Sequence, residues 1–101
     1  MTQDEAQAKL EEYRLMVDVV DRRIVELLNE RTRVVEEIGR VKREAQLPIY
    51  EPKREDMVFA NITECNQGPL PAAGLRRIFE RIIDEARTIQ RLRMSAGGDR
   101  K

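Results

Sequence analysis

The sequence predicts an all-α protein whose chain forms three helices, one long, one short and one medium. Its composition is rich in residues with high helix propensity, chiefly Glu, Arg, Leu, Ala and Ile. No segment alternates apolar and polar residues as a half-buried strand does. Near the N-terminus, apolar side chains instead recur every three or four positions, which is the period that places them on one face of a helix.

The first helix is expected to run from about residue 4 to residue 45, because no Pro interrupts it and Gly39 is its only internal weak point. Its apolar face contains Leu10, Tyr13, Val17, Val20, Ile24, Leu27, Leu28, Val34, Val35 and Ile38. Such a helix measures about 60 Å, whereas a compact chain of about 100 residues has a radius of gyration of about 13 Å. Because the other helices of one chain cannot cover this face, the sequence predicts a homodimer whose long helices pack together.

Two prolines separate the first helix from the second. Pro48 disfavours the α conformation of the residue before it, and Pro52 suits the first turn of a new helix. The second helix is expected over 52–65. The segment NQGPLP ends it, because Asn66 or Gly68 can adopt a positive φ.

The third helix is expected over 72–94, with an apolar face that contains Leu75, Ile78, Phe79, Ile82, Ile83, Ala86 and Ile89. The segment SAGGDRK that follows is typical of a frayed end or of the start of a linker. The sequence therefore predicts one domain over 1–94 and a flexible C-terminal tail over 95–101.

The composition argues against several classes of protein. The chain has 19 basic and 19 acidic residues, whereas partners such as nucleic acid and anionic membranes usually select a basic surface. No apolar run approaches the roughly 20 residues that span a bilayer, and the N-terminus lacks the apolar stretch of a signal peptide. Because the chain has one Cys and no His, we expect no disulfide within it and no metal site. We expect a cytoplasmic protein with no metal, no cofactor, no nucleic acid and no membrane as partner.

Polar residues on the apolar faces of all three helices are the first candidates for a functional site. Arg31 and Lys42 follow the apolar face of the first helix, Arg54 that of the second and Gln90 that of the third. Any one of them alone is more often a side chain that lies over apolar surface and keeps its charged end in water. Because the charged members share one sign and buried charge is costly unless paired, the set predicts an interior site for a small polyanion.

The residues that such a site lacks restrict its chemistry. Without His, a phosphate-binding loop or a Cys in a reactive context, most covalent and acid–base mechanisms have no catalytic groups. A reaction that needs only a restrained conformation and a stabilised transition-state charge would suit the site.

The order and spacing of these residues resemble those of the all-helical, AroQ-class chorismate mutases. The resemblance extends from about residue 10 to residue 90, and LPIYEPKRE and NQGPLP are most similar to members that stand alone or are fused to 3-deoxy-arabino-heptulosonate-7-phosphate (DAHP) synthase. The matching positions are Arg14, Asp21, Ile24, Leu28, Arg31, Val35, Gly39, Lys42, Pro48, Glu51, Arg54, Glu55 and Gln90.

The resemblance implies an intertwined helical homodimer that converts chorismate to prephenate, a Claisen rearrangement in the biosynthesis of aromatic amino acids. It implies that Arg14 reaches across the dimer interface and holds a substrate carboxylate together with Arg31. Lys42 and Gln90 would donate hydrogen bonds to the ether oxygen, where negative charge develops as the C–O bond breaks.

The second helix supplies the remaining residues that the resemblance implies. Arg54 would orient the other carboxylate region of the substrate, and Glu55 would accept a hydrogen bond from the ring hydroxyl. Glu51 stands near that hydroxyl where many members have Asp, so its role is open. Ala86 stands where some members have a Ser that assists carboxylate binding, and that contact would be missing here.

Three alternatives stay open at the level of sequence. Isochorismate pyruvate lyase resembles the same family in fold and site. A regulatory module of DAHP synthase that binds chorismate or prephenate would carry the same residues. A helical dimerisation module would explain the long apolar face but not Lys42 and Gln90 within apolar faces.

Overall fold

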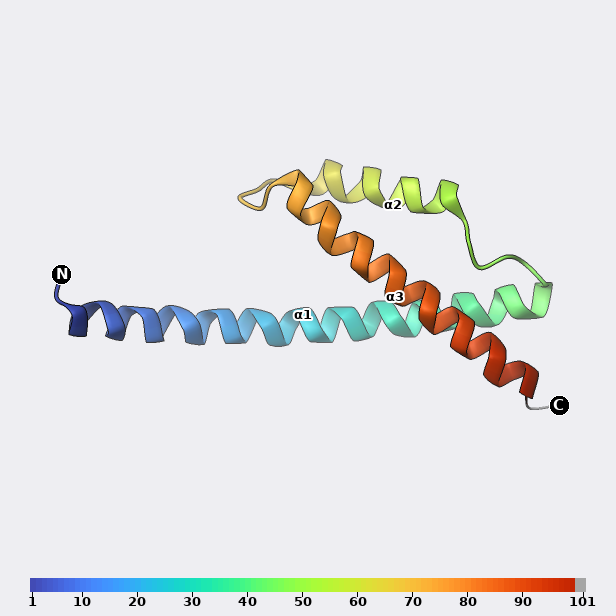
Figure 1. Ribbon diagram of the computed structural model, residues 1–101, viewed down its shortest axis with the longest axis horizontal. Coiled ribbons are helices and arrows are strands. Elements are labelled where there is room, and N and C mark those ends of the chain that lie inside the picture. The colour runs from blue at the N-terminus through green and yellow to red at the C-terminus, as the bar shows by residue number, and fades with distance from the viewer. Residues whose placement is uncertain (100–101) are drawn as a thin grey trace. The chain divides into compact units, whose positions relative to one another are not determined.

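The structure is a computed structural model that describes the backbone of residues 1–99 and the side chains of residues 1–93. The described chain contains three α-helices and no strand: α1 is Gln3–Ala45, α2 is Pro52–Cys65 and α3 is Ala72–Asp99 (Figure 1). The predicted all-α fold with one long, one short and one medium helix is therefore confirmed. The chain divides into two compact units, Met1–Arg33 and Val34–Lys101, whose boundary lies within α1.

Local hydrogen bonds explain where α1 begins and ends. At its start, the Thr2 hydroxyl accepts a hydrogen bond of 3.1 Å from the Glu5 backbone N–H, which satisfies one of the unpaired donors of the first turn. At its end, Gln46 has a φ of 57°, and the Leu47 N–H donates to the Lys42 carbonyl over 2.8 Å. A left-handed residue with such a bond is a common helix C-terminus, and Pro48 follows.

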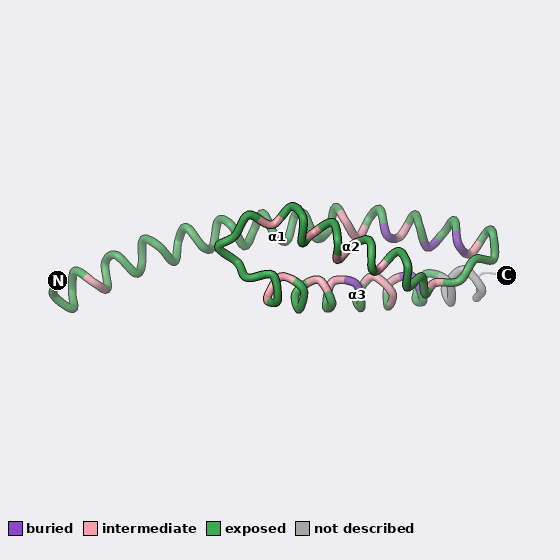
Figure 2. The backbone as a smooth tube through the Cα atoms, turned by 90° about the horizontal axis from the view of Figure 1, so that it is seen from above, coloured by how far each residue is buried: buried purple, intermediate pink, exposed green. Residues whose placement is uncertain are grey.

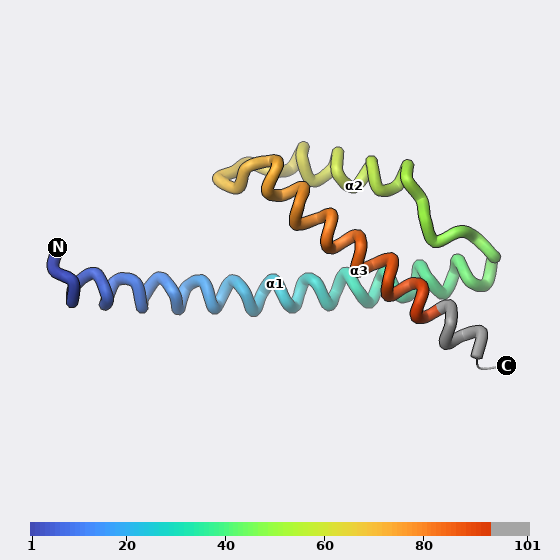
Figure 3. Tube along the Cα trace, in the orientation of Figure 1, coloured from blue at the N-terminus to red at the C-terminus, as the bar shows by residue number. Residues whose placement is uncertain are grey.

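The connection from α2 to α3 is organised by Asn66. Its side-chain oxygen accepts from the Gly68 N–H at 3.0 Å, and its Nδ2 donates to the Leu70 carbonyl at 2.9 Å. Gly68, rather than Asn66, adopts the positive φ, at 76°, because only Gly does so without steric cost. The chain reverses here, so that α2 and α3 lie against each other within the second unit (Figure 3).

The third helix continues beyond its predicted end at Met94 and reaches Asp99. The expected end rested on the small and polar residues after Met94. Gly within a helix costs only about 1 kcal/mol relative to Ala, too little by itself to end a helix. The predicted tail, 95–101, therefore overlaps α3, and its residues 100–101 lie outside the described residues.

Few side chains are buried within one chain. Among residues 1–93, the buried positions are Val35, Gly39, Lys42, Ile83 and Gln90, all in the second unit (Figure 2). Two of them are polar, so the best-buried part of this unit is also where polar groups meet. In the first unit, by contrast, the large apolar residues of α1 are exposed.

Within the described residues, none of the helices combines the length and the apolar character that crossing a membrane would require.

Candidate functional site

The site begins with a close approach between α1 and α3 at Gly39. A Cβ atom added at Gly39 would lie 3.3 Å from Gln90 Cγ and 3.5 Å from Gln90 Cα. The missing side chain therefore makes room for Gln90 itself. Since Lys42 follows Gly39 by three residues, it lies on the same face of α1, and the close approach brings the two polar side chains together.

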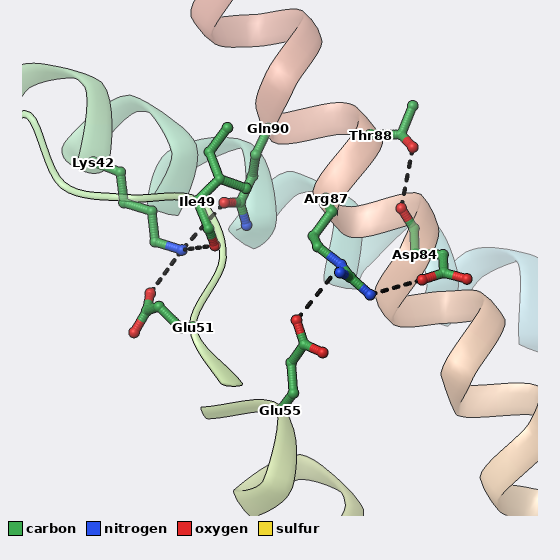
Figure 4. A network of polar contacts seen from close by, with 8 residues as sticks. All are labelled: Lys42, Ile49, Glu51, Glu55, Asp84, Arg87, Thr88 and Gln90. Carbon is green, nitrogen blue, oxygen red and sulfur yellow. Dashed lines mark hydrogen bonds and ion pairs between the residues drawn. The ribbon is translucent and has the colours of Figure 1, made fainter. Parts of the chain in front are cut away.

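Lys42 is the centre of the first polar cluster. Its Nζ atom donates to the Ile49 carbonyl at 3.1 Å and to Gln90 Oε1 at 3.2 Å, and it lies 2.7 Å from Glu51 Oε1 (Figure 4). An ammonium group has three protons, so these acceptors match its full capacity. Residue exposure is only 7% for both Lys42 and Gln90, and burial of a charge at this depth requires such partners.

These contacts also determine the orientation of the Gln90 amide. Because an ammonium can only donate, it is the carbonyl oxygen of Gln90 that faces Lys42. The amide nitrogen therefore points away from Lys42 (Figure 4). The cluster thus presents one ammonium and one amide donor next to each other.

Glu51 occupies the N-cap position of α2, but its side chain makes no capping hydrogen bond. Its carboxylate is paired with Lys42 instead. The free-energy cost of the missing capping hydrogen bond is offset in part by Pro52 at the start of α2, because Pro52 has no N–H to satisfy. The long Glu side chain therefore joins the segment before α2 to the buried ammonium.

A second polar cluster joins α2 to α3. Arg87 Nε lies 3.5 Å from Glu55 Oε2, and Arg87 Nη2 lies 2.8 Å from Asp84 Oδ1. The side chains of Arg87 and Glu55 are 28% and 22% exposed. The structure pairs Glu55 with Arg87 because both side chains project into the space between α2 and α3 (Figure 4).

The structure places the seven residues predicted from the sequence in different environments. It brings Lys42, Gln90 and Glu51 into direct contact, while Glu55 belongs to the second cluster. Arg54 is exposed on α2.

The first unit contains the remaining two predicted residues. Arg14 is exposed and lies 3.6 Å from Glu11 one turn earlier. Arg31 is half-buried. Their predicted roles toward a substrate stay predictions.

Arg87 is the site residue that the sequence reasoning missed. The signal was present, because Ile83, Arg87 and Gln90 are spaced i, i+4 and i+7 and so share one face of a helix. From the sequence we placed the neighbouring residue Ala86 on the apolar face of this helix and did not consider Arg87. A charged residue between a buried Ile83 and a buried Gln90 is the pattern that would have identified it.

Among the described residues, no group of three or more His, Cys, Asp or Glu side chains could hold a metal ion.

The comparison with protein families identifies the family of the chain. The model of chorismate mutase type II matches residues 13–91, which include both polar clusters. The chain belongs to the type II chorismate mutase family. The family predicted from the order of the site residues is thereby confirmed.

Two relatives show how members of this chorismate mutase family differ in length. A bifunctional chorismate mutase/prephenate dehydratase of Aquifex aeolicus is 34% identical over 87 residues, which are 82% of this chain but 24% of the relative. A chorismate mutase of Methanocaldococcus jannaschii is 26% identical over 84 residues, which are 82% of this chain and 85% of the relative. The chain therefore spans about a quarter of the length of the bifunctional relative.

Solved chorismate mutases share the fold. The form II structure of chorismate mutase from Thermus thermophilus is 40% identical, with a TM-score of 0.80 over 82% of this chain and 94% of that chain. A chorismate mutase from Helicobacter pylori in complex with prephenate is 24% identical, with a TM-score of 0.80 over 87% of this chain and 96% of that chain. At that identity, the second likeness concerns the fold alone.

Proposed function

We propose that this protein converts chorismate to prephenate by a Claisen rearrangement. The observation that carries the proposal is the buried Lys42 ammonium, fixed beside the Gln90 amide in a member of the chorismate mutase family. In this reaction a C–O bond of the enol ether breaks while a C–C bond forms within the same molecule. No proton is gained or lost, which suits a site that has neither His nor a reactive Cys.

Lys42 and Gln90 act on the ether oxygen. Negative charge grows on this oxygen as the C–O bond breaks, and a preorganised donor in a site with little water stabilises that charge more than it stabilises the substrate. Gln90 Oε1 already accepts from Lys42, so its amide N–H is the group that donates to the substrate. Glu51 is the partner of Lys42 that gives way, because its side chain is 49% exposed.

The carboxylates of chorismate bind the cationic residues. Arg31 and Arg14 hold one carboxylate, with Arg14 supplied by the second subunit of a homodimer, and Arg54 orients the other carboxylate region. Glu55 accepts a hydrogen bond from the ring hydroxyl. The restrained substrate is then held in the compact conformer from which the two ends react, and this lowers the entropic part of the barrier.

The exposed apolar face of α1 supports the proposed homodimer. Tyr13, Val17 and Ile24 are 61%, 55% and 46% exposed, and a row of such side chains along one helix favours a second apolar surface. A second copy of the chain has the matching face. We expect the dimer to work in the cytoplasm, and an interaction with DAHP synthase stays a prediction.

The test is the loss of the ultraviolet absorbance of chorismate after addition of the purified protein, with prephenate identified by its conversion to phenylpyruvate in acid. We expect prephenate to form faster with the protein than without it. No acceleration from a folded dimer, alone or with DAHP synthase, would contradict it. Release of pyruvate from isochorismate in place of prephenate formation would assign the protein to the lyases instead.

A further inference from the structure

We propose that Arg87 is a positioning residue that holds Glu55 in place to accept the substrate's ring hydroxyl, and that it thereby contributes to the choice of substrate orientation. The inference rests on the proposed function, in which Glu55 accepts that hydrogen bond. Its physical basis lies in the second polar cluster, which is separate from the contacts of Lys42 (Figure 4).

Arg87 is fixed from three directions. Asp84, one turn earlier on α3, accepts a hydrogen bond of 2.8 Å from Nη2. Glu55 on α2 lies 3.5 Å from Nε. The ring of Tyr50, in the segment before α2, lies 5.6 Å from the guanidinium carbon, within the range of a cation–π contact. A planar guanidinium held in this way has little freedom, so it can restrain its partner.

The restraint acts on one oxygen of Glu55. Oε2 faces Arg87, and the other carboxylate oxygen points away from the guanidinium (Figure 4). A carboxylate can accept several hydrogen bonds, so contact with Arg87 leaves capacity for a donor from the substrate. Arg87 Nε is itself buried and makes no hydrogen bond within the described residues. Since an unpaired buried donor is unfavourable, a small movement of Glu55 toward Nε would be favoured.

The charges of this cluster determine which part of a substrate it suits. Glu55 and Asp84 together carry one more negative charge than Arg87 balances. A substrate carboxylate would be repelled there, whereas a neutral hydroxyl could donate to Glu55. The cluster therefore directs the hydroxyl-bearing side of the ring toward α2 and leaves the carboxylates to the cationic residues. Without Arg87, Glu55 would lose the cation that fixes its orientation.

The experiment compares Arg87→Gln, Arg87→Lys and Glu55→Gln on two substrates, chorismate and an analogue in which hydrogen replaces the ring hydroxyl. Because Arg87→Gln removes a charge-assisted contact with Glu55, we expect it to lower kcat/KM for chorismate by about 10- to 50-fold. On the analogue, the wild-type protein and Arg87→Gln should differ by less than about 3-fold, since no hydroxyl is present to be held. The double variant Arg87→Gln/Glu55→Gln should lose no more than Glu55→Gln alone.

A matched control is Arg76→Gln on the same helix. Arg76 also has a carboxylate partner, Glu80 at 3.5 Å, and an aromatic partner, Phe59 at 4.0 Å from its guanidinium carbon. It has no place in either polar cluster, so kcat/KM should remain at the wild-type value. Arg87→Lys retains the charge without the planar group and should lose less than Arg87→Gln. This variant allows the same test if Arg87→Gln unfolds, which thermal melting would show.

Two results would overturn the inference while leaving the proposed function intact. One is unchanged kcat/KM for chorismate in folded Arg87→Gln and Arg87→Lys. The other is an equal loss on both substrates, which would make Arg87 a structural residue without a role toward the hydroxyl. If the wild-type protein formed no prephenate, the proposed function itself would fail and the inference with it.

Discussion

The two parts of α1 carry the same sequence pattern but differ in what covers them. From Val34 onward, Val35, Gly39 and Lys42 are buried. Before that point the apolar face continues, yet Val17 and Ile24 are 55% and 46% exposed. The period of apolar residues thus predicts which side of a helix avoids water, but it does not predict whether the cover comes from the same chain. The first part is thus left exposed by its own chain, which is why we propose it as the interface between subunits, whereas the second part contributes Lys42 to the first polar cluster.

The polar residues of the two parts differ in the same way. Lys42 has three acceptors and is buried. Arg14 is exposed and paired only at 3.6 Å with Glu11 in the same helix. Exposed pairs of this kind contribute little to stability. The role that we propose for Arg14 therefore lies outside its own chain, in the binding of substrate together with the second subunit.

The largest expected effect comes from Lys42→Ala in the buried part. If Lys42 stabilises the charge on the ether oxygen, its removal should lower kcat by about 10²- to 10³-fold, with a smaller change in KM. Far-ultraviolet circular dichroism should still report a helical protein. Lys53→Ala, the same change at an exposed position of α2, should leave kcat unaltered. A Lys42→Ala variant with wild-type turnover would refute the role of the cluster.

The next effect concerns the exposed part of α1. Val20→Asp places a charge in the predicted interface, and burial of an unpaired charge costs several kcal/mol, so the dimer Kd should rise by about 100-fold or more. Analytical ultracentrifugation would measure it. Arg22→Asp introduces the same residue about 200° around the helix, and its dimer should persist. An unchanged Kd for Val20→Asp would mean that this face is not the interface.

A smaller effect is expected at the close approach of α1 and α3. In Gly39→Ala the new Cβ would lie 3.3 Å from Gln90 Cγ, so Gln90 must shift away by a few tenths of an ångström. If Gln90 donates to the ether oxygen, such a displacement should lower kcat by about tenfold. Steady-state kinetics would measure the loss.

The control for this prediction is Gly74→Ala near the start of α3. Its nearest neighbour would be Leu70 Cδ1 at 3.6 Å, an ordinary contact. We expect unchanged kcat and a free energy of unfolding up to about 1 kcal/mol higher, because Ala favours helix. Equal kinetics for both variants would show that the approach of Gln90 to Gly39 does not control the site.

Much of the fold was predictable because its signals are local. The prolines at 48, 52, 69 and 71 delimit the helices, and the bounds of α2 agree with the prediction. The left-handed Gln46 at the end of α1 was not expected, since Gln has no particular preference for that conformation. The end of α3 was misplaced because Gly discourages a helix without forbidding it.

The candidate site was predictable only in part. Lys42 and Gln90 could be found because a polar residue on an apolar face is visible in one helix at a time. The pairing of Glu55 with Arg87 could not, because it depends on how α2 and α3 approach each other. Glu51 illustrates the same limit, since nothing in its local sequence indicates that its carboxylate binds a lysine of α1 rather than capping α2.

The central claim is that one active site combines the buried part of α1 from one chain with the exposed part from another. The most direct test mixes Arg14→Ala and Lys42→Ala, each inactive by itself, under conditions that exchange subunits. A mixed dimer would hold one site with both defects and one intact site, so random pairing predicts recovery of roughly a quarter of the wild-type rate of prephenate formation. A rate no higher than the sum of the two variants, in a sample shown to contain mixed dimers, would contradict the account.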